Sequence, residues 1–148
     1  MDTLIYTKIA QVLKLKVPEL RWIDMDMGQL DSNTRPAVAF PCLLVTTAIT
    51  GADTFYQSHT GYGQNCRATV TVTLAFEPLG ATNTAAPDSV VATSLMPYAV
   101  IDKVHKALQG VETDTMEPLL RISQGKKRSR NNLFQYEIRF ATTLLDEA

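Results

Sequence analysis

The sequence has few of the features that mark an enzyme, a metalloprotein or a membrane protein. It holds only two cysteines, Cys42 and Cys66, whose spacing fits neither a metal site nor a redox motif. We interpret them as reduced thiols of a cytosolic product, with a disulfide between neighbouring strands as the alternative. No apolar run approaches the roughly 20 residues that span a bilayer, so no membrane contact is expected.

Strong net charge and a leader are also lacking. The first residues, Met1 to Thr3, do not show the basic start and apolar core of a signal peptide, so no secretory leader is expected. The formal net charge is −1, so no global field draws the chain toward nucleic acid or a membrane. A chain of 148 residues with 45% hydrophobic residues is expected to fold as one globular domain, residues 1–148.

Motifs of catalysis are missing as well. The chain has no Gly-x-Ser-x-Gly elbow, phosphate-binding loop, dinucleotide fingerprint or His-Glu-x-x-His motif. Ser58 and His59 are adjacent, but a triad needs partners placed by the fold and an orienting third group. His105 falls at the edge of an apolar helical stripe, where packing or capping is usual. We therefore expect no catalytic residue, no cofactor, no bound metal and no enzyme activity.

The most regular feature that is present is an alternation of side chains over residues 67–77. Successive strand residues point to opposite faces, so the segment is predicted to be a long strand with one buried face. The other face is polar and nearly uncharged, which suits a wet surface, a contact with another protein, or both. The apolar face carries Ala68, Val70, Val72, Leu74 and Phe76, and the polar face carries Thr69, Thr71 and Thr73.

Helical and strand periodicities alternate along the rest of the chain. Helices are predicted at residues 3–15 and about 97–109; residues 89–96 could add a helical turn, but Pro97 is expected to break a continuous helix. Further strands are predicted at residues 20–27, 42–50, 119–124 and 133–145. Residues 51–64 are predicted to be a mobile loop or a long hairpin tip. The predicted fold is α+β, an antiparallel or mixed five-stranded sheet with two helices packed on one face and the other face left open, in the order α-β-β-β-α-β-β.

Asp24 and Asp26 are the first candidate site. They are two residues apart on a predicted strand, so their carboxylates would share one face, ~6–7 Å apart. A metal site needs more ligands, and nothing nearby in the sequence supplies a third. A solvated strand end is therefore the competing interpretation.

A basic cluster and an aromatic segment are the other candidates. Four of the 14 basic residues fall in the predicted turn 125–132, which is either a solvated hairpin tip or a contact for DNA phosphates or an acidic partner. The tip has no aromatic residue to stack on bases, so sequence-specific recognition is not expected. Aromatic side chains in residues 51–64 either contact a partner or tuck under their own loop. The residues concerned are Lys126, Lys127, Arg128 and Arg130, and Phe55, Tyr56 and Tyr62.

Residues 22–30 (WIDMDMGQL), followed by residues 35–41 (RPAVAFP) and a strand, resemble the tail terminator (tail completion) proteins of long-tailed phages and prophages. The resemblance extends, through the order of elements, over nearly the whole chain. It implies a single tail-terminator-like domain and a non-enzymatic virion structural protein. Such a protein forms a homo-oligomeric ring, commonly a hexamer, that caps the tail tube and joins it to head completion or neck proteins. It also implies a place in the virion tail, and in the host cytoplasm during assembly.

The resemblance assigns expected roles to the surfaces named above. The threonine face becomes the candidate lumen or subunit interface, the aromatic segment a candidate partner contact, and the basic cluster a candidate non-specific contact with passing DNA. One alternative is a tail-tube or head–tail connector subunit. An alternative from a different class is a small nucleic-acid-binding or metal-dependent α+β domain, supported by the basic cluster and by Asp24 and Asp26.

Overall fold

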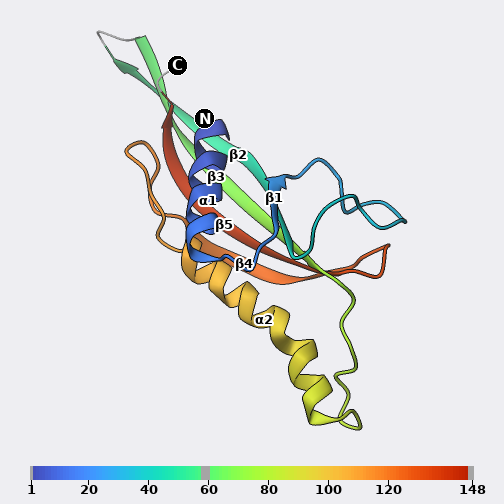
Figure 1. Cartoon of the computed structure of the whole chain (residues 1–148). Helices are drawn as coiled ribbons and strands as arrows, with labels where there is room; N and C mark the ends of the chain where they lie inside the picture. The colour runs from blue at the N-terminus through green and yellow to red at the C-terminus, as the bar shows by residue number, and fades with distance from the viewer. Residues whose placement is uncertain (1, 58–60, 147–148) are drawn as a thin grey trace.

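The computed structural model describes residues 2–57 and 61–146. Two helices and a mixed five-stranded sheet follow one another in the predicted order, α-β-β-β-α-β-β (Figure 1). No helix among the described residues is long and apolar enough to cross a membrane. The elements are α1 (Asp2–Lys16), β1 (Trp22–Met25), β2 (Cys42–Gln57), β3 (Gly61–Phe76), α2 (Asp88–Leu108), β4 (Leu120–Lys127) and β5 (Phe134–Asp146).

The sheet is centred on β3, in the strand order β1-β2-β3-β5-β4. The short β1 runs parallel to β2, and the other neighbours are antiparallel. β2 and β3 are both 16 residues long and pair along their whole length, so they form a long hairpin. The predicted hairpin of the last two strands is confirmed, and the mixed sheet is one of the two predicted forms.

The main core lies between the sheet and the two helices, which pack on the same face as predicted. On the sheet side, the core contains the five apolar residues of β3 that alternate with the threonines, and all five are buried: Ala68, Val70, Val72, Leu74 and Phe76. Ile138 and Phe140 extend this layer onto β5 with no exposed surface. The helices add Ile5, Ile9 and Leu13 from α1, and Ile101, Val104 and Leu108 from α2.

A second, smaller core covers one end of the opposite face. Residues 28–41 fold over the sheet there, and Leu30 and Phe40 pack with Cys42, Leu44 and Ala75. An ion pair between Arg35 and Glu77, with 2.8 Å between nitrogen and oxygen, holds this loop to the end of β3. We expected the face opposite the helices to stay open along its whole length, and this is wrong at the end of the sheet that residues 28–41 cover.

The expectation that Pro97 breaks the second helix is also wrong. α2 is continuous from Asp88 to Leu108, with Pro97 inside it. Proline cannot donate to the carbonyl of Thr93, but Thr93 is exposed, so water can satisfy that oxygen. The predicted end of the helix is confirmed, because Gly110 follows it with φ +82°.

Two predicted loop segments are strand. Of residues 51–64, residues 51–57 belong to β2 and 61–64 to β3, so the hairpin alternative is correct for them. Ser58, His59 and Thr60 lie outside the described residues. At the other hairpin, β4 continues to Lys127 because Lys126 and Lys127 pair with Tyr136 and Gln135 of β5. Those two lysines are therefore strand residues and not turn residues.

Candidate assembly surfaces

The threonine face of β3 is only partly accessible. Thr69 and Thr71 are half-buried and lie opposite Ala48 and Thr46 of β2. Thr73 is 3% exposed, and its partner in register, Leu44, belongs to the second core. Thr73 therefore offers almost no surface to another molecule. The part of this face that a partner could contact includes Thr46, Thr69 and Thr71.

Lysine substitutions should separate the accessible threonines from the buried one. We expect Thr69→Lys to change the free energy of unfolding by less than about 0.5 kcal/mol, because the long side chain can reach solvent and its partners in register, Ala48 and Ala141, are uncharged. Thr73→Lys should cost about 1–3 kcal/mol, because a larger charged group must enter a packed site. Urea unfolding measures both, with Thr73→Val as the control that preserves volume. Equal losses for the two lysine variants would contradict this assignment.

The tip of the β2–β3 hairpin carries an exposed aromatic pair. Tyr56 and Tyr62 are partners in register, their ring centroids are 5.4 Å apart in an edge-on arrangement, and each is 67% exposed. Phe55 instead packs across the backbone of Gly63, where a Cβ would lie 2.6 Å from the Phe55 ring. Phe55 therefore packs against its own hairpin, whereas Tyr56 and Tyr62 are exposed. The hairpin that carries them extends beyond the helices (Figure 1).

The sheet has two open edges, one on each side. β1 pairs only with residues 42–45 of β2, so residues 48–56 of β2 have no strand on their outer side among the described residues. We call this stretch the β2 edge. On the other side, residues 122–127 of β4 likewise have no outer strand in the described part of the chain, and we call them the β4 edge. An exposed isoleucine lies on each, Ile49 on the β2 edge and Ile122 on the β4 edge.

The basic cluster divides between the two faces of the sheet. Lys126 lies on the helix side, with its Nζ 5.6 Å from the centroid of the Phe134 ring. Lys127, Arg128 and Arg130 instead line a polar pocket on the opposite side, together with Asp31 and Gln135. The four residues therefore do not form one uniform charged tip.

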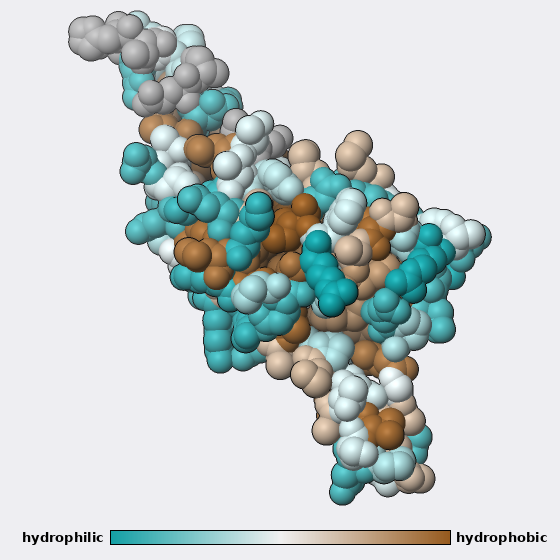
Figure 2. All heavy atoms as spheres, viewed as in Figure 1, coloured by the Kyte–Doolittle hydropathy of each residue, from teal (hydrophilic) through white to brown (hydrophobic). Residues whose placement is uncertain are grey.

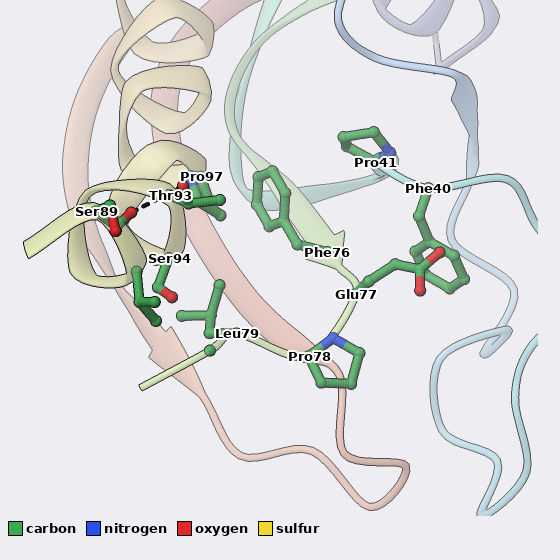
Figure 3. A pocket seen from close by; sticks show the side chains of 12 residues that line it. Phe40, Pro41, Phe76, Glu77, Pro78, Leu79, Ser89, Thr93, Ser94 and Pro97 are labelled. Carbon is green, nitrogen blue, oxygen red and sulfur yellow. Dashed lines mark hydrogen bonds between the residues drawn. The ribbon is translucent and has the colours of Figure 1, made fainter. Parts of the chain in front are cut away.

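An apolar groove of about 620 Å³ lies between the end of β3, residues 77–80 and the first half of α2 (Figure 3). Phe40, Phe76, Leu79 and Pro97 contribute to its walls. The one ionisable lining residue is Glu77, and its hydrogen bonds from Arg35 lower the pKa of its carboxyl. Since that carboxylate already has a partner, the groove is suited to apolar contact and not to acid–base chemistry. Sequence reasoning missed it, because the glycine, proline and small polar residues of segment 79–89 indicate only a surface linker.

Asp24 and Asp26 are engaged with the chain that follows β1. Asp24 accepts hydrogen bonds from the Met25 backbone N–H at 2.8 Å and the Gln29 amide at 3.4 Å, and Asp26 accepts one from the Gly28 N–H at 3.0 Å. These contacts order the turn at residues 26–29. Within the described residues, no group of three or more His, Cys, Asp or Glu side chains is placed to hold a metal ion.

His105 and the cysteines have structural surroundings. The His105 ring stacks on Phe140 with 6.5 Å between centroids, and its Nδ1 accepts a hydrogen bond from the Arg121 guanidinium at 3.3 Å, since arginine can only donate. Cys42 and Cys66 are both free and buried, in different cores. Burial raises the pKa of the Cys42 thiol to about 11, which keeps it protonated and unreactive near neutral pH.

Figure 2 shows hydrophobic side chains reaching the surface in separate patches among hydrophilic ones on the face that it views. No protein-family model and no curated protein matches the chain. A solved structure with a similar backbone is described as "Virion of native gene transfer agent (GTA) particle". The two chains share 10% sequence identity at a TM-score of 0.48, over 97% of this chain and 94% of the other. At that identity the likeness concerns backbone arrangement only.

Proposed function

We propose that this chain is a non-enzymatic virion structural protein that assembles head to tail into a closed ring, as a tail terminator does. The observation that carries the proposal is the pair of open edges on opposite sides of one sheet. Each edge presents backbone N–H and C=O groups that a further strand can pair with. A contact between two different edges is heterologous, so it repeats from copy to copy and closes into a ring when the rotation allows.

Charge favours pairing of unlike edges over pairing of like edges. The side of the sheet with β4 carries Arg121, Lys126 and Lys127, whereas the β1 side carries Asp24 and Asp26 together with Arg21, which leaves one net negative charge there. Two β4 edges facing each other would bring like charges together, which is unfavourable. A β4 edge facing the β1–β2 side of the next copy would bring opposite charges together, which is the head-to-tail arrangement.

The remaining surfaces suit contacts with other virion proteins. The Tyr56–Tyr62 pair is large, rigid and amphipathic, as anchors of protein interfaces usually are. The uncharged surface of Thr69 and Thr71 suits a lumen or a subunit contact. On this proposal the ring is a homohexamer, its partners are the tail-tube protein and a head completion or neck protein, and it resides in the virion tail.

A tube-capping experiment tests the function directly. The tail-tube protein of the same particle is allowed to polymerise with and without this protein, and tube length is measured by negative-stain microscopy. We expect shorter tubes that carry a ring at one end. Unchanged tube length with no ring at either end would refute the capping role.

A tail-tube or head–tail connector subunit is the second candidate, since heterologous edges also build open filaments. Filaments formed by the purified protein alone would favour it. A metal-dependent domain finds little support, because Asp24 and Asp26 already accept backbone or side-chain hydrogen bonds.

A further inference from the structure

The turn between β4 and β5 forms a basic pocket against residues 28–36. The hollow measures about 300 Å³, and its lining includes Lys127, Arg128, Arg130, Asp31 and Gln135. Figure 1 shows the end of this hairpin beside the loop that follows β1. The pocket joins segments that are about 100 residues apart in the sequence.

The pocket is held by hydrogen bonds between the turn and the loop. Gln135 is 3% exposed, and its amide nitrogen donates to the Ser129 hydroxyl at 3.3 Å and to the Leu30 carbonyl at 3.5 Å. Asn131 donates from its side chain to the same carbonyl at 3.2 Å, and its side-chain oxygen accepts from the Ser129 hydroxyl. The turn is therefore fixed in place before any ligand arrives.

The cations of this pocket form no ion pair with a carboxylate in the described part of the chain. Other basic residues of the chain, such as Arg35, Arg67 and Lys103, form ion pairs with carboxylates. Lys127, Arg128 and Arg130 form none within the described residues. Three positive groups thus converge on one hollow where Asp31 can offset only one of them. An anionic ligand would relieve this repulsion.

We propose that this pocket binds a phosphate group of a nucleic-acid backbone. Two guanidinium groups suit phosphate, because their planar forks can donate two hydrogen bonds to a pair of its oxygens. A backbone carries a negative charge about every 3.4 Å along each strand, so it can neutralise more than one excess cation. The lining has no aromatic side chain to stack on a base, so the interaction is with phosphate and independent of sequence.

Binding of a short mixed-sequence DNA duplex, measured by fluorescence anisotropy at several salt concentrations, tests the proposal. We expect salt-sensitive binding by the parent protein. The double variant Arg128→Ala with Arg130→Ala should bind the duplex roughly tenfold more weakly. The slope of the logarithm of its binding constant against the logarithm of salt concentration should also be smaller, by about 1 for each phosphate that is no longer neutralised. Asp31→Asn should bind more tightly, because it removes the one opposing charge.

Lys126→Ala is the matched control. It removes one positive charge, as the single variant Arg128→Ala does, but its ammonium lies over the Phe134 ring on the other face of the sheet. It should change binding by less than about twofold.

A parent protein that does not bind the duplex, or a Lys126→Ala loss equal to that of the double variant, would overturn the proposal. If polyglutamate at equal charge concentration displaces the duplex, the proposal is also overturned, and the pocket is better explained as a contact for an acidic protein. Repeating the comparison of the double variant with its parent, with Ile122→Lys present in both proteins, separates this result from ring formation, because the added lysine is then common to both.

Discussion

Ile122→Lys is expected to yield a folded protein that remains a monomer. Ile122 is 58% exposed on the β4 edge, so its replacement removes little packing and should change the free energy of unfolding by less than about 0.5 kcal/mol. Lys126 and Lys127 already lie at one end of this edge, and a third lysine at its other end would add a further charge to desolvate and leave no uncharged end for pairing with another strand. Light scattering gives the mass, and thermal unfolding reports whether the fold is kept.

Leu15→Lys is the control for that experiment. Leu15 is 80% exposed on α1, and α1 contacts β1, which lies at the opposite end of the sheet from β4. The same change of side chain there should leave assembly intact. Normal assembly by Ile122→Lys, or equal loss by Leu15→Lys, would show that the β4 edge is not the subunit contact.

A mixing experiment extends the same prediction. Ala48→Lys blocks the β2 edge and should also give a monomer. Each variant keeps one intact edge, so an equal mixture of Ile122→Lys and Ala48→Lys should form a heterodimer that cannot grow further. Contacts between like edges would instead let each variant dimerise by itself. The mass of the mixture therefore reports directly whether the subunits meet head to tail.

Ile138→Ala is expected to cost about 2–5 kcal/mol of unfolding free energy, and Ile138→Val about 0.5–1.5 kcal/mol. Ile138 has no exposed surface, and it lies on β5 between Val72 of β3 and Gln124 of β4. The alanine leaves a cavity in the main core, which removes a large share of the roughly 5–15 kcal/mol that holds a typical domain folded.

The measurement is urea unfolding in the Ile122→Lys background, because ring formation would otherwise add its own stabilisation. Leu120→Ala in the same background provides the comparison on the neighbouring strand; Leu120 is 55% exposed, so its loss should stay within about 0.5 kcal/mol. A loss below about 1 kcal/mol for Ile138→Ala would contradict the position of the core.

Much of the fold follows from local patterns in the sequence. The alternation around Val70 and Val72 fixes which side of β3 is buried, and the stripe of Ile5 and Ile9 identifies α1, because burial and side-chain period are linked in a strand and in a helix. The continuous α2 was not predictable from proline chemistry alone. The cost of Pro97 depends on whether the carbonyl it leaves unbonded can reach solvent, and that depends on tertiary structure.

The candidate surfaces depend on tertiary packing that no local pattern contains. Thr73 has the same sequence signature as Thr71, and only the closure of residues 28–41 over one end of the sheet distinguishes them. The open edges follow from the strand order, in which β1 covers four residues of a 16-residue strand. The basic pocket needs Asp31 and Arg128 to line the same hollow, and they do so only in the folded chain.

The mass of the purified protein in solution, combined with negative-stain images of the same sample, tests the central claim most directly. Head-to-tail pairing of the β2 and β4 edges predicts one discrete mass that is a multiple of the 16.3 kDa chain, six-fold for a hexamer, and closed rings in the images. A monomer at every concentration, which also fails to bind tail-tube protein, would contradict the claim.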